Sequence, residues 1–289
     1  MQVSGQVSSA GAVAFRPPSL FEGGLATPSR PAEPATIIHA AQSEPASRNN
    51  PELRAHALMA QDVYNDKANP PAGYRAASTA ELKELGLDPA MLARGDFRAR
   101  VYVGGSADNP SYTIAFRGSQ SAGDWVTNLR QGMGMDSVHY RQALEIGERV
   151  ARSPLADRVD FTGHSLGGGL ASAAALAAGR PADTFNAAGL SDKTIEQAAA
   201  IRGEAGASLP RVDAWFVRGE VLSGAQDGGD RVAGFILGGI PGALLADAPP
   251  AYGIRHGLDA QAPDDKNWIE RHNPVNKHGM DWVLNSLPH

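Results

Sequence analysis

The sequence predicts an α/β domain in which a mainly parallel sheet carries helices on both faces. Short apolar or alternating runs, typical of strands, take turns with amphipathic or alanine-rich runs, typical of helices. In the middle of the chain, one apolar run leads directly into Gly163-His164-Ser165-Leu166-Gly167 and then into a helix-forming run that extends to Ala178. This order of strand, tight turn and helix predicts the fold class and supplies the first candidate functional residue.

The composition is that of a chain with one large folded domain or two small ones. Of its 289 residues, 42% are hydrophobic, which is enough to bury a full core. Residues 1–49 are rich in Ser, Ala, Pro and Gly and show almost no apolar periodicity, so we expect a disordered leader there. A basic start followed by an apolar core is missing from this leader, so we do not expect a cleaved signal peptide. Residues 50–289 are expected to form the folded domain.

Charge and cysteine content exclude several classes of function. The net charge is −5 and no basic cluster interrupts it, which argues against nucleic acid as the main partner. The chain has no cysteine, which excludes disulfides, thiolate nucleophiles and cysteine zinc sites but assigns no compartment.

A Ser/Pro-rich leader fits a protein that is secreted or translocated by a specialised bacterial secretion system. A cytoplasmic location is the alternative.

Periodicity and capping signals predict the remaining elements. Helices are expected over 51–63, 79–85, 136–152 and 191–201, and at the C-terminus from residue 279. Strands are expected over 97–103, 112–116, 183–187 and 212–217, in addition to the strand that precedes Gly163. The segment 104–110 contains Gly, Asn, Asp and Pro and predicts a hairpin turn between the first two strands.

Ser165 is predicted to be a nucleophile on a strand-to-helix elbow. Such a turn holds the serine hydroxyl above the sheet in strained backbone geometry, and Gly163 and Gly167 remove side chains that would collide there. The following helix adds unpaired amides and the positive end of its dipole. A chance serine in a glycine-rich loop is the alternative, but the strand before it and the helix after it favour the elbow.

A second segment resembles a known family when it is taken together with the elbow. Phe116-Arg117-Gly118-Ser119, followed by Trp125, is similar to the oxyanion strand and first lid turn of the class 3 lipases, the fungal triacylglycerol lipase type. The resemblance covers about residue 50 to the C-terminus and implies an α/β-hydrolase fold. It also implies that the amides of Ser119 and Leu166 form an oxyanion hole, where two donors lower the barrier by several kcal/mol. An ordinary turn serine is the alternative for Ser119.

A serine nucleophile needs a base, and the base needs an acid that orients it. Glu220 follows the strand 212–217, where this fold delivers its acid. The class 3 family usually has Asp there with an apolar residue two positions later, and Glu220 and Leu222 match this pattern with Glu for Asp; Asp227 is the second candidate. For the base, His278 precedes the expected terminal helix, and His256, with a similar local sequence, is the competitor.

These residues predict a serine hydrolase that cleaves carboxylic esters of acyl lipids, most specifically a phospholipase A or lipase. Ser165 attacks the ester, His278 moves the proton and Glu220 orients the imidazole. No metal or organic cofactor is expected. The uncharged stretch 232–246 is expected to contact acyl chains, either as pocket lining or as a flap on a lipid surface.

Several alternatives share the same residues. A general carboxylesterase or a triacylglycerol lipase would use an identical triad, whereas nothing marks the second binding domain that a peptidase of this fold would need. An inactive hydrolase fold that binds lipid or protein is the alternative of another class. If the chain is a translocated effector, an immunity or chaperone protein is a possible partner.

Overall fold

The computed structural model describes residues 51–119, 138–226 and 249–288. All of them belong to one compact unit, Ile38–His289. The expected leader 1–49, the residues Trp125 and Asp227, and the uncharged stretch 232–246 lie outside the described residues. Within the described ranges, none of the helices combines the length and the apolar character that crossing a membrane requires.

The sheet is antiparallel at one side and parallel through its centre. Its strands are β1 (Arg75–Ala76), β2 (Ala93–Arg94), β3 (Phe97–Ser106), β4 (Asn109–Phe116), β5 (Val159–His164), β6 (Ala182–Phe185), β7 (Val212–Val217) and β8 (Ile254–Leu258). Their order is β1-β3-β4-β5-β6-β7-β8, and β2 pairs with β3. The pairs from β4 to β8 are parallel, so their carboxyl ends meet at one edge of the sheet.

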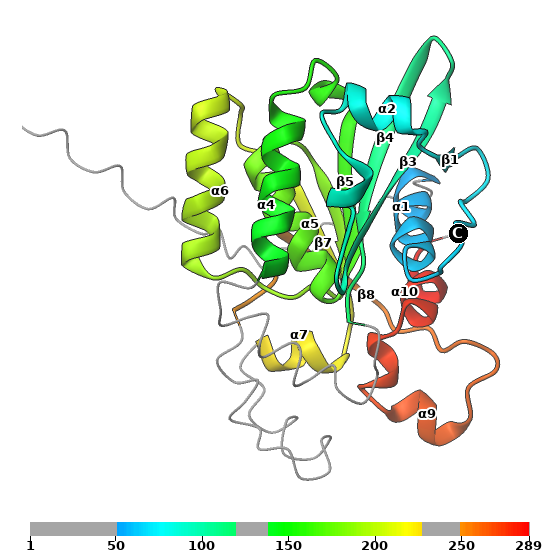
Figure 1. Ribbon diagram of the computed structural model, residues 1–289. Coiled ribbons are helices and arrows are strands. Elements are labelled where there is room, and N and C mark those ends of the chain that lie inside the picture. Colours follow the sequence, from blue (N-terminus) through cyan, green and yellow to red (C-terminus); the bar gives the residue numbers. More distant parts are fainter. Residues whose placement is uncertain (1–50, 120–137, 227–248, 289) are drawn as a thin grey trace, which may run out of the picture. The chain divides into compact units, whose positions relative to one another are not determined.

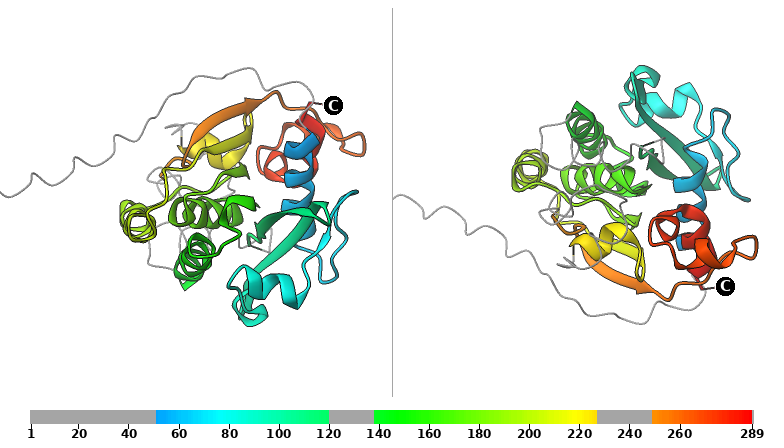
Figure 2. Two further views of the ribbon diagram at one scale, coloured as in Figure 1. Left: turned by 90° about the horizontal axis from the view of Figure 1, so that it is seen from above. Right: turned by 90° about the horizontal axis from the view of Figure 1, so that it is seen from below.

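Helices cover both faces of this sheet (Figures 1 and 2). The α-helices are α1 (Pro51–Asp62), α2 (Thr79–Glu84), α4 (Val138–Ala151), α5 (Leu166–Ala178), α6 (Asp192–Ala205), α7 (Val221–Gln226), α9 (Trp268–His272) and α10 (Met280–Ser286). Short 3-10 turns are η1 (Pro89–Met91), η2 (Ala156–Arg158) and η4 (Asn276–His278). One face carries α4, α5 and α6, and the other carries α1 and α10.

Each face has its own apolar core, which follows from the pattern of a sheet buried on both sides. Every residue of α5 is buried, because its small alanines and glycines let it pack against both the sheet and its neighbours α4 and α6. On the opposite face, Leu53 and Ala57 of α1 pack with Phe185, Trp215 and residues of α10. The predicted fold class, an α/β-hydrolase-like domain with a mainly parallel sheet, is confirmed.

Some elements differ from the prediction. The hairpin loop is shorter than expected, because β3 continues to Ser106 and β4 begins at Asn109. The helix that Ser191 caps runs to Ala205, beyond the expected end at residue 201. The sequence pattern did not predict β8, α7 or α9. Their short lengths, of five or six residues, explain why periodicity did not reveal them.

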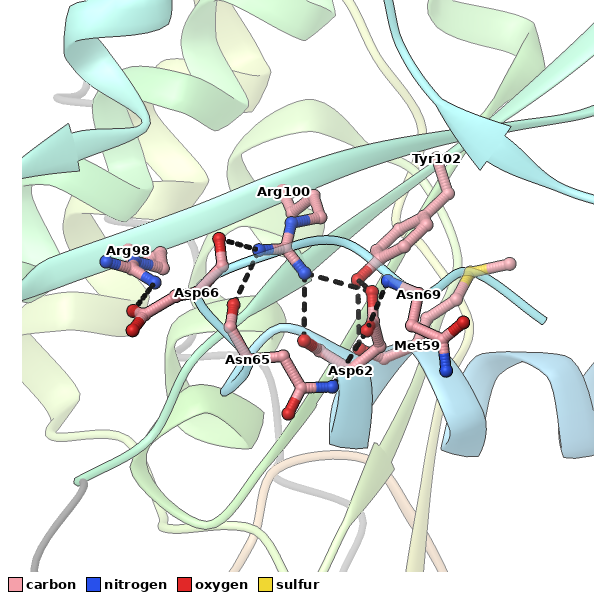
Figure 3. A network of polar contacts seen from close by, with 8 residues as sticks. All are labelled: Met59, Asp62, Asn65, Asp66, Asn69, Arg98, Arg100 and Tyr102. Atoms are coloured by element: carbon pink, nitrogen blue, oxygen red, sulfur yellow. Dashed lines mark hydrogen bonds and ion pairs between the residues drawn. The ribbon is translucent and has the colours of Figure 1, made fainter.

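A buried polar network ties the chain after α1 to strand β3 (Figure 3). The Asp62 carboxylate, which is only 4% exposed, accepts hydrogen bonds from Arg100 Nη1 at 2.9 Å and from the Tyr102 hydroxyl at 2.8 Å. Arg100 also donates to the Asp62 carbonyl at 2.8 Å and to the Asn65 carbonyl at 2.7 Å. The two bonds from Arg100 to backbone carbonyls on either side of Tyr64 fix the turn that contains it. The Tyr64 hydroxyl lies near the candidate site.

Candidate active site

Ser165 occupies a sharp turn between β5 and α5. It has φ 58° and ψ −128°, a left-handed backbone region that non-glycine residues rarely adopt. The turn is fixed by its own backbone: the Ser165 amide donates to the Phe185 carbonyl at 3.0 Å, and the Ser165 carbonyl accepts from Ala188 at 3.0 Å. Strained geometry of this kind persists only where the surroundings determine it, and it is common at functional sites.

The glycines on both sides of Ser165 are required by close packing. A Cβ at Gly163 would collide with the backbone of Gly167, and a Cβ at Gly167 would collide with the carbonyl of Phe116. The start of α5 therefore lies directly against the end of β4. This packing brings the helix N-terminus, which is the positive end of the helix dipole, next to the segment that leads to Ser119.

The segment after β4 follows the elbow closely. Phe116 pairs with Gly163 in the parallel ladder, and the Gly118 amide donates to the Tyr64 hydroxyl at 3.0 Å. Ser119 is half-buried and is the last described residue of this segment. Ser119 and Leu166, the two expected oxyanion donors, thus follow the carboxyl ends of neighbouring strands, β4 and β5.

Glu220 and His278 form a buried pair, although 58 positions separate them. Glu220 is fully buried after β7, and its Oε2 lies 2.7 Å from His278 Nδ1. The same oxygen accepts the Leu222 amide at 2.9 Å, and Oε1 accepts the Ser223 amide. Burial alone would raise the pKa of Glu220, but the charge of His278 and the hydrogen bonds from His278, Ser223 and Leu222 outweigh it and hold the pKa below its ordinary value.

The carboxylate of Glu220 determines which nitrogen of His278 can act as a base. An ionised carboxylate only accepts hydrogen bonds, so Nδ1 of the neutral imidazole carries the proton and Nε2 carries the lone pair. His278 ends the turn η4, is separated from α10 by Gly279 alone, and is 8% exposed. This is the tautomer that a general base for a serine hydroxyl requires.

His278 lies next to the elbow. His164 Nε2 is 2.7 Å from the His278 carbonyl oxygen, and the two imidazole rings are 4.9 Å apart between centroids. His164 is the residue immediately before Ser165. The Asn186 side-chain amide also donates to the His278 carbonyl, at 2.9 Å, while its Oδ1 accepts the Val217 amide at 2.9 Å. The loop of His278 is therefore held at the ends of β5, β6 and β7.

The other histidine candidates lie elsewhere. His256 is on β8, where its Nε2 contacts Asp213 Oδ1 of β7 at 2.6 Å and its ring stacks on Trp215 with centroids 4.2 Å apart. His272 is exposed on α9. Among these histidines, the structure brings His278 together with Glu220. Asp227, the second acid candidate, lies outside the described residues.

In the described part of the chain, three residues of types that can bind a metal ion lie close together, but this cluster is remote from Ser165. Ligand atoms of Glu52, His56 and Asp160 lie within 4.8 Å of one another. Asp160 is at the start of β5, so roughly 16 Å of extended strand separates it from Ser165 at about 3.3 Å per residue. His56 Nδ1 is already 2.8 Å from Asp183 Oδ2, which accounts for the imidazole as the cation of an ion pair.

Sequence reasoning missed Tyr64, His164 and Asn186 as parts of the site. Tyr64 appeared only as the end of a helix, and His164 only as the variable position of the elbow. Asn186 carried the one available signal, an Asn at the end of a strand, because Asn tolerates the left-handed backbone that it adopts here with φ 43°.

The fold, the strained serine and the buried carboxylate–imidazole pair define the class as α/β-hydrolase. Residues 55–264 match the phospholipase-like family described as the Tle-like phospholipase domain, and the chain belongs to this family. The predicted resemblance to bacterial lipases and phospholipases is thereby confirmed.

One relative of this chain is described as a phospholipase of a specific type. The chain is 42% identical over 145 residues to an extracellular phospholipase A1 from Serratia liquefaciens. The alignment covers 50% of this chain and 44% of the relative, so the chain matches less than half of that protein's length. The matched family and this relative agree in naming phospholipases.

Proposed function

We propose that the chain is a phospholipase A that hydrolyses a carboxylic ester of a phospholipid with Ser165, His278 and Glu220 as its triad. The observation that carries this proposal is the 2.7 Å contact between buried Glu220 and Nδ1 of His278, on a loop tied to the residue before Ser165. Family membership and the phospholipase A1 relative support the substrate class. The relative's name makes the sn-1 ester the first candidate.

The reaction proceeds through an acyl-enzyme. The Ser165 hydroxyl attacks the ester carbonyl while His278 Nε2 takes its proton, and the negative charge that develops on the carbonyl oxygen is stabilised by the amides of Ser119 and Leu166. The imidazolium is stabilised by Glu220 and then protonates the leaving lysophospholipid alkoxide. Water, deprotonated by His278, attacks the acyl-enzyme and releases the fatty acid.

An exposed apolar pair supports a lipid surface as the place of reaction. Trp268 and Ile269 of α9 are 73% and 72% exposed. The turn that ends in His278 is linked to this helix, because Asn276 donates to the Glu270 carbonyl at 3.4 Å. Figure 1 shows α7 and α9 at the end of the sheet where the parallel strands finish. Tryptophan is favoured at membrane–water interfaces, where its ring can sit at headgroup level.

Product analysis tests this function. The protein is incubated with phosphatidylcholine and phosphatidylglycerol vesicles and, separately, with a triglyceride emulsion, and the lipids are measured by mass spectrometry. We expect lysophospholipid and free fatty acid, with turnover about a millionfold lower in Ser165→Ala. Hydrolysis of triglyceride alone would identify a neutral lipase, and no hydrolysis of either substrate would indicate an inactive binding module.

Export and protein partners remain predictions. The Serratia relative is described as extracellular, which supports secretion of this chain, by a route that the expected leader would specify. An immunity or chaperone protein remains a predicted partner.

A further inference from the structure

A series of hydrogen bonds beside the candidate triad joins Tyr64, His164 and His278. The donor and the acceptor of each bond can be assigned from the chemistry of the groups. His164 is buried, and its burial together with the charge of His278 lowers its pKa to about 3. The imidazole is therefore neutral at physiological pH and has one N–H. The His278 carbonyl can only accept, so the 2.7 Å contact places this proton on Nε2. Nδ1 of His164 is consequently an acceptor.

Tyr64 donates a hydrogen bond to this acceptor nitrogen of His164. Its hydroxyl lies 3.2 Å from His164 Nδ1 and 3.5 Å from the His164 carbonyl, so its single proton goes to the nearer nitrogen. The hydroxyl oxygen in turn accepts the Gly118 amide at 3.0 Å. Three bonds therefore point the same way, from the Gly118 amide through Tyr64 and His164 to the His278 carbonyl. Hydrogen bonds that run in one direction polarise and strengthen one another.

This series of hydrogen bonds ends at the segment of Ser119 on one side and at the loop of His278 on the other. Both segments must be aligned with a bound substrate. Gly118 precedes Ser119, and a Cβ at Gly118 would collide with the Tyr64 hydroxyl and the His164 carbonyl, so the close approach requires glycine. The far end holds the backbone of His278. The turn that contains Tyr64 is held by the bonds from Arg100 to the backbone carbonyls of Asp62 and Asn65, which Figure 3 shows.

We propose that Tyr64 and His164 are positioning residues that couple the oxyanion segment at Ser119 to the loop that carries His278. This proposal rests on the proposed function of Ser165 and His278. Tyr64 fixes the direction of the Gly118–Ser119 backbone, and His164 fixes the distance of the His278 loop from the elbow. Errors of about 1 Å in such geometry can reduce turnover on the order of a hundredfold.

Tyr64→Phe tests the series of hydrogen bonds, because it removes the hydroxyl with little change in the shape of the side chain. Turnover of a short soluble ester is expected to fall about 10- to 100-fold, with KM changed less than threefold, because alignment at the reacting carbonyl is lost rather than substrate binding. Tyr102→Phe is the matched control. It removes another buried tyrosine hydroxyl from the network that holds the same turn, but Asp62 keeps its bonds to Arg100. Its turnover should stay within threefold of wild type.

Two further variants show whether the residues act as one unit. His164→Leu removes both hydrogen bonds of the side chain, whereas His164→Gln keeps an amide donor at similar reach. Turnover of the glutamine variant should therefore be at least tenfold higher than that of the leucine variant. In the double variant Tyr64→Phe/His164→Leu, turnover should equal that of His164→Leu, because one chain is broken once. Multiplied losses would show two independent effects and contradict the coupling.

The outcomes separate this proposal from the proposed function. If Ser165→Ala abolishes hydrolysis while Tyr64→Phe and Tyr102→Phe have equal turnover, only the positioning role is overturned. If Ser165→Ala retains the activity, the proposed function fails first. Thermal unfolding of both tyrosine variants, expected to agree within a few degrees, establishes that differences in turnover do not reflect loss of folded protein.

Discussion

At the scale of single residues, Glu220, the proposed acid, shows how a side chain one methylene longer than aspartate can reach His278. The carboxylate remains fully buried and is oriented by the amides of Leu222 and Ser223, which leaves Oε2 directed at His278. The extra methylene is accommodated because Glu220 accepts bonds from the first turn of the helix that follows it. The substitution of Glu for Asp within the family pattern is thus compatible with the pairing.

Replacing Glu220 with Gln should reduce turnover by roughly 10³- to 10⁴-fold, while the protein still folds. A glutamine amide removes the negative charge that stabilises the imidazolium and allows the wrong tautomer of His278. The variant is compared with wild type on a soluble ester across pH 6 to 9. Turnover within tenfold of wild type would show that another acid, such as Asp227, serves the base.

At the scale of elements, the elbow depends on the contact between α5 and the end of β4. Gly167→Ala should lower the free energy of unfolding by about 1–3 kcal/mol, because the added Cβ would collide with the Phe116 carbonyl. Gly203→Ala in α6 is the matched control. Beyond the backbone of its own helix and its chain neighbours, no described atom lies within 4 Å of a Cβ at Gly203, so alanine should stabilise that helix by about 0.5–1 kcal/mol. Urea unfolding measures both, and equal effects would contradict the packing argument.

The exposed pair on α9 provides a second prediction at this scale. Trp268→Ser/Ile269→Ser should reduce binding to phospholipid vesicles at least tenfold while turnover of a soluble ester stays within twofold. Leu209→Ser is the control, because Leu209 is 64% exposed but precedes β7, at the edge of the sheet away from the site. Vesicle co-sedimentation compares the three proteins. Unchanged binding of the double variant would remove α9 as the lipid-facing element.

Prediction from sequence succeeded where the structure depends on local pattern. The strand, turn and helix around Ser165 lie within twenty residues, and their periodicity and glycines are sufficient to recognise them. The positions of Glu220 at the end of a strand and of His278 before a helix follow the order of the fold, and their side chains lie in contact. Their roles as acid and base stay predictions. Tyr64 could not be predicted, because its contact with His164 joins positions 100 residues apart. No local pattern encodes such a contact.

At the scale of the whole molecule, the parallel sheet gathers distant residues at one edge and buries ionisable groups in its centre. The segments that contain Ser119, Ser165, Asn186 and Glu220 follow the ends of β4, β5, β6 and β7. Burial close to His278 keeps His164 neutral, with a pKa of about 3. On the other face, burial opposes the charge of His56, but its bond to Asp183 and the nearby carboxylates outweigh burial and raise the pKa.

These two histidines should give opposite contributions to stability as a function of pH. For His164, the unfolded chain binds more protons between about pH 3 and 6.5, so its contribution is complete above pH 6.5 and is lost as the pH falls. The difference in unfolding free energy between wild type and His164→Gln should shrink by up to about 1.4 kcal/mol per pH unit below 6.5. Urea unfolding from pH 4.5 to 7 measures this difference. A constant difference would show that folding does not lower the pKa of His164, which would contradict its neutral state in the fold.

His56→Gln is the internal control for this experiment. Because the folded pKa of His56 is raised, its contribution is complete below pH 6.5 and is lost as the pH rises through the folded value. The difference between wild type and His56→Gln should therefore shrink above pH 6.5 and stay nearly constant below it. The same pH trend in both variants would contradict the assignment of the two charges.

The most direct test of the central claim is to locate the nucleophile by its covalent adduct. The protein is treated with a fluorophosphonate, digested and mapped by mass spectrometry, beside His278→Ala and Glu220→Gln. We expect one adduct, on Ser165, that forms at least a hundredfold more slowly in His278→Ala. An unmodified Ser165 in protein that still hydrolyses phospholipid, or an equal labelling rate without His278, would contradict the account.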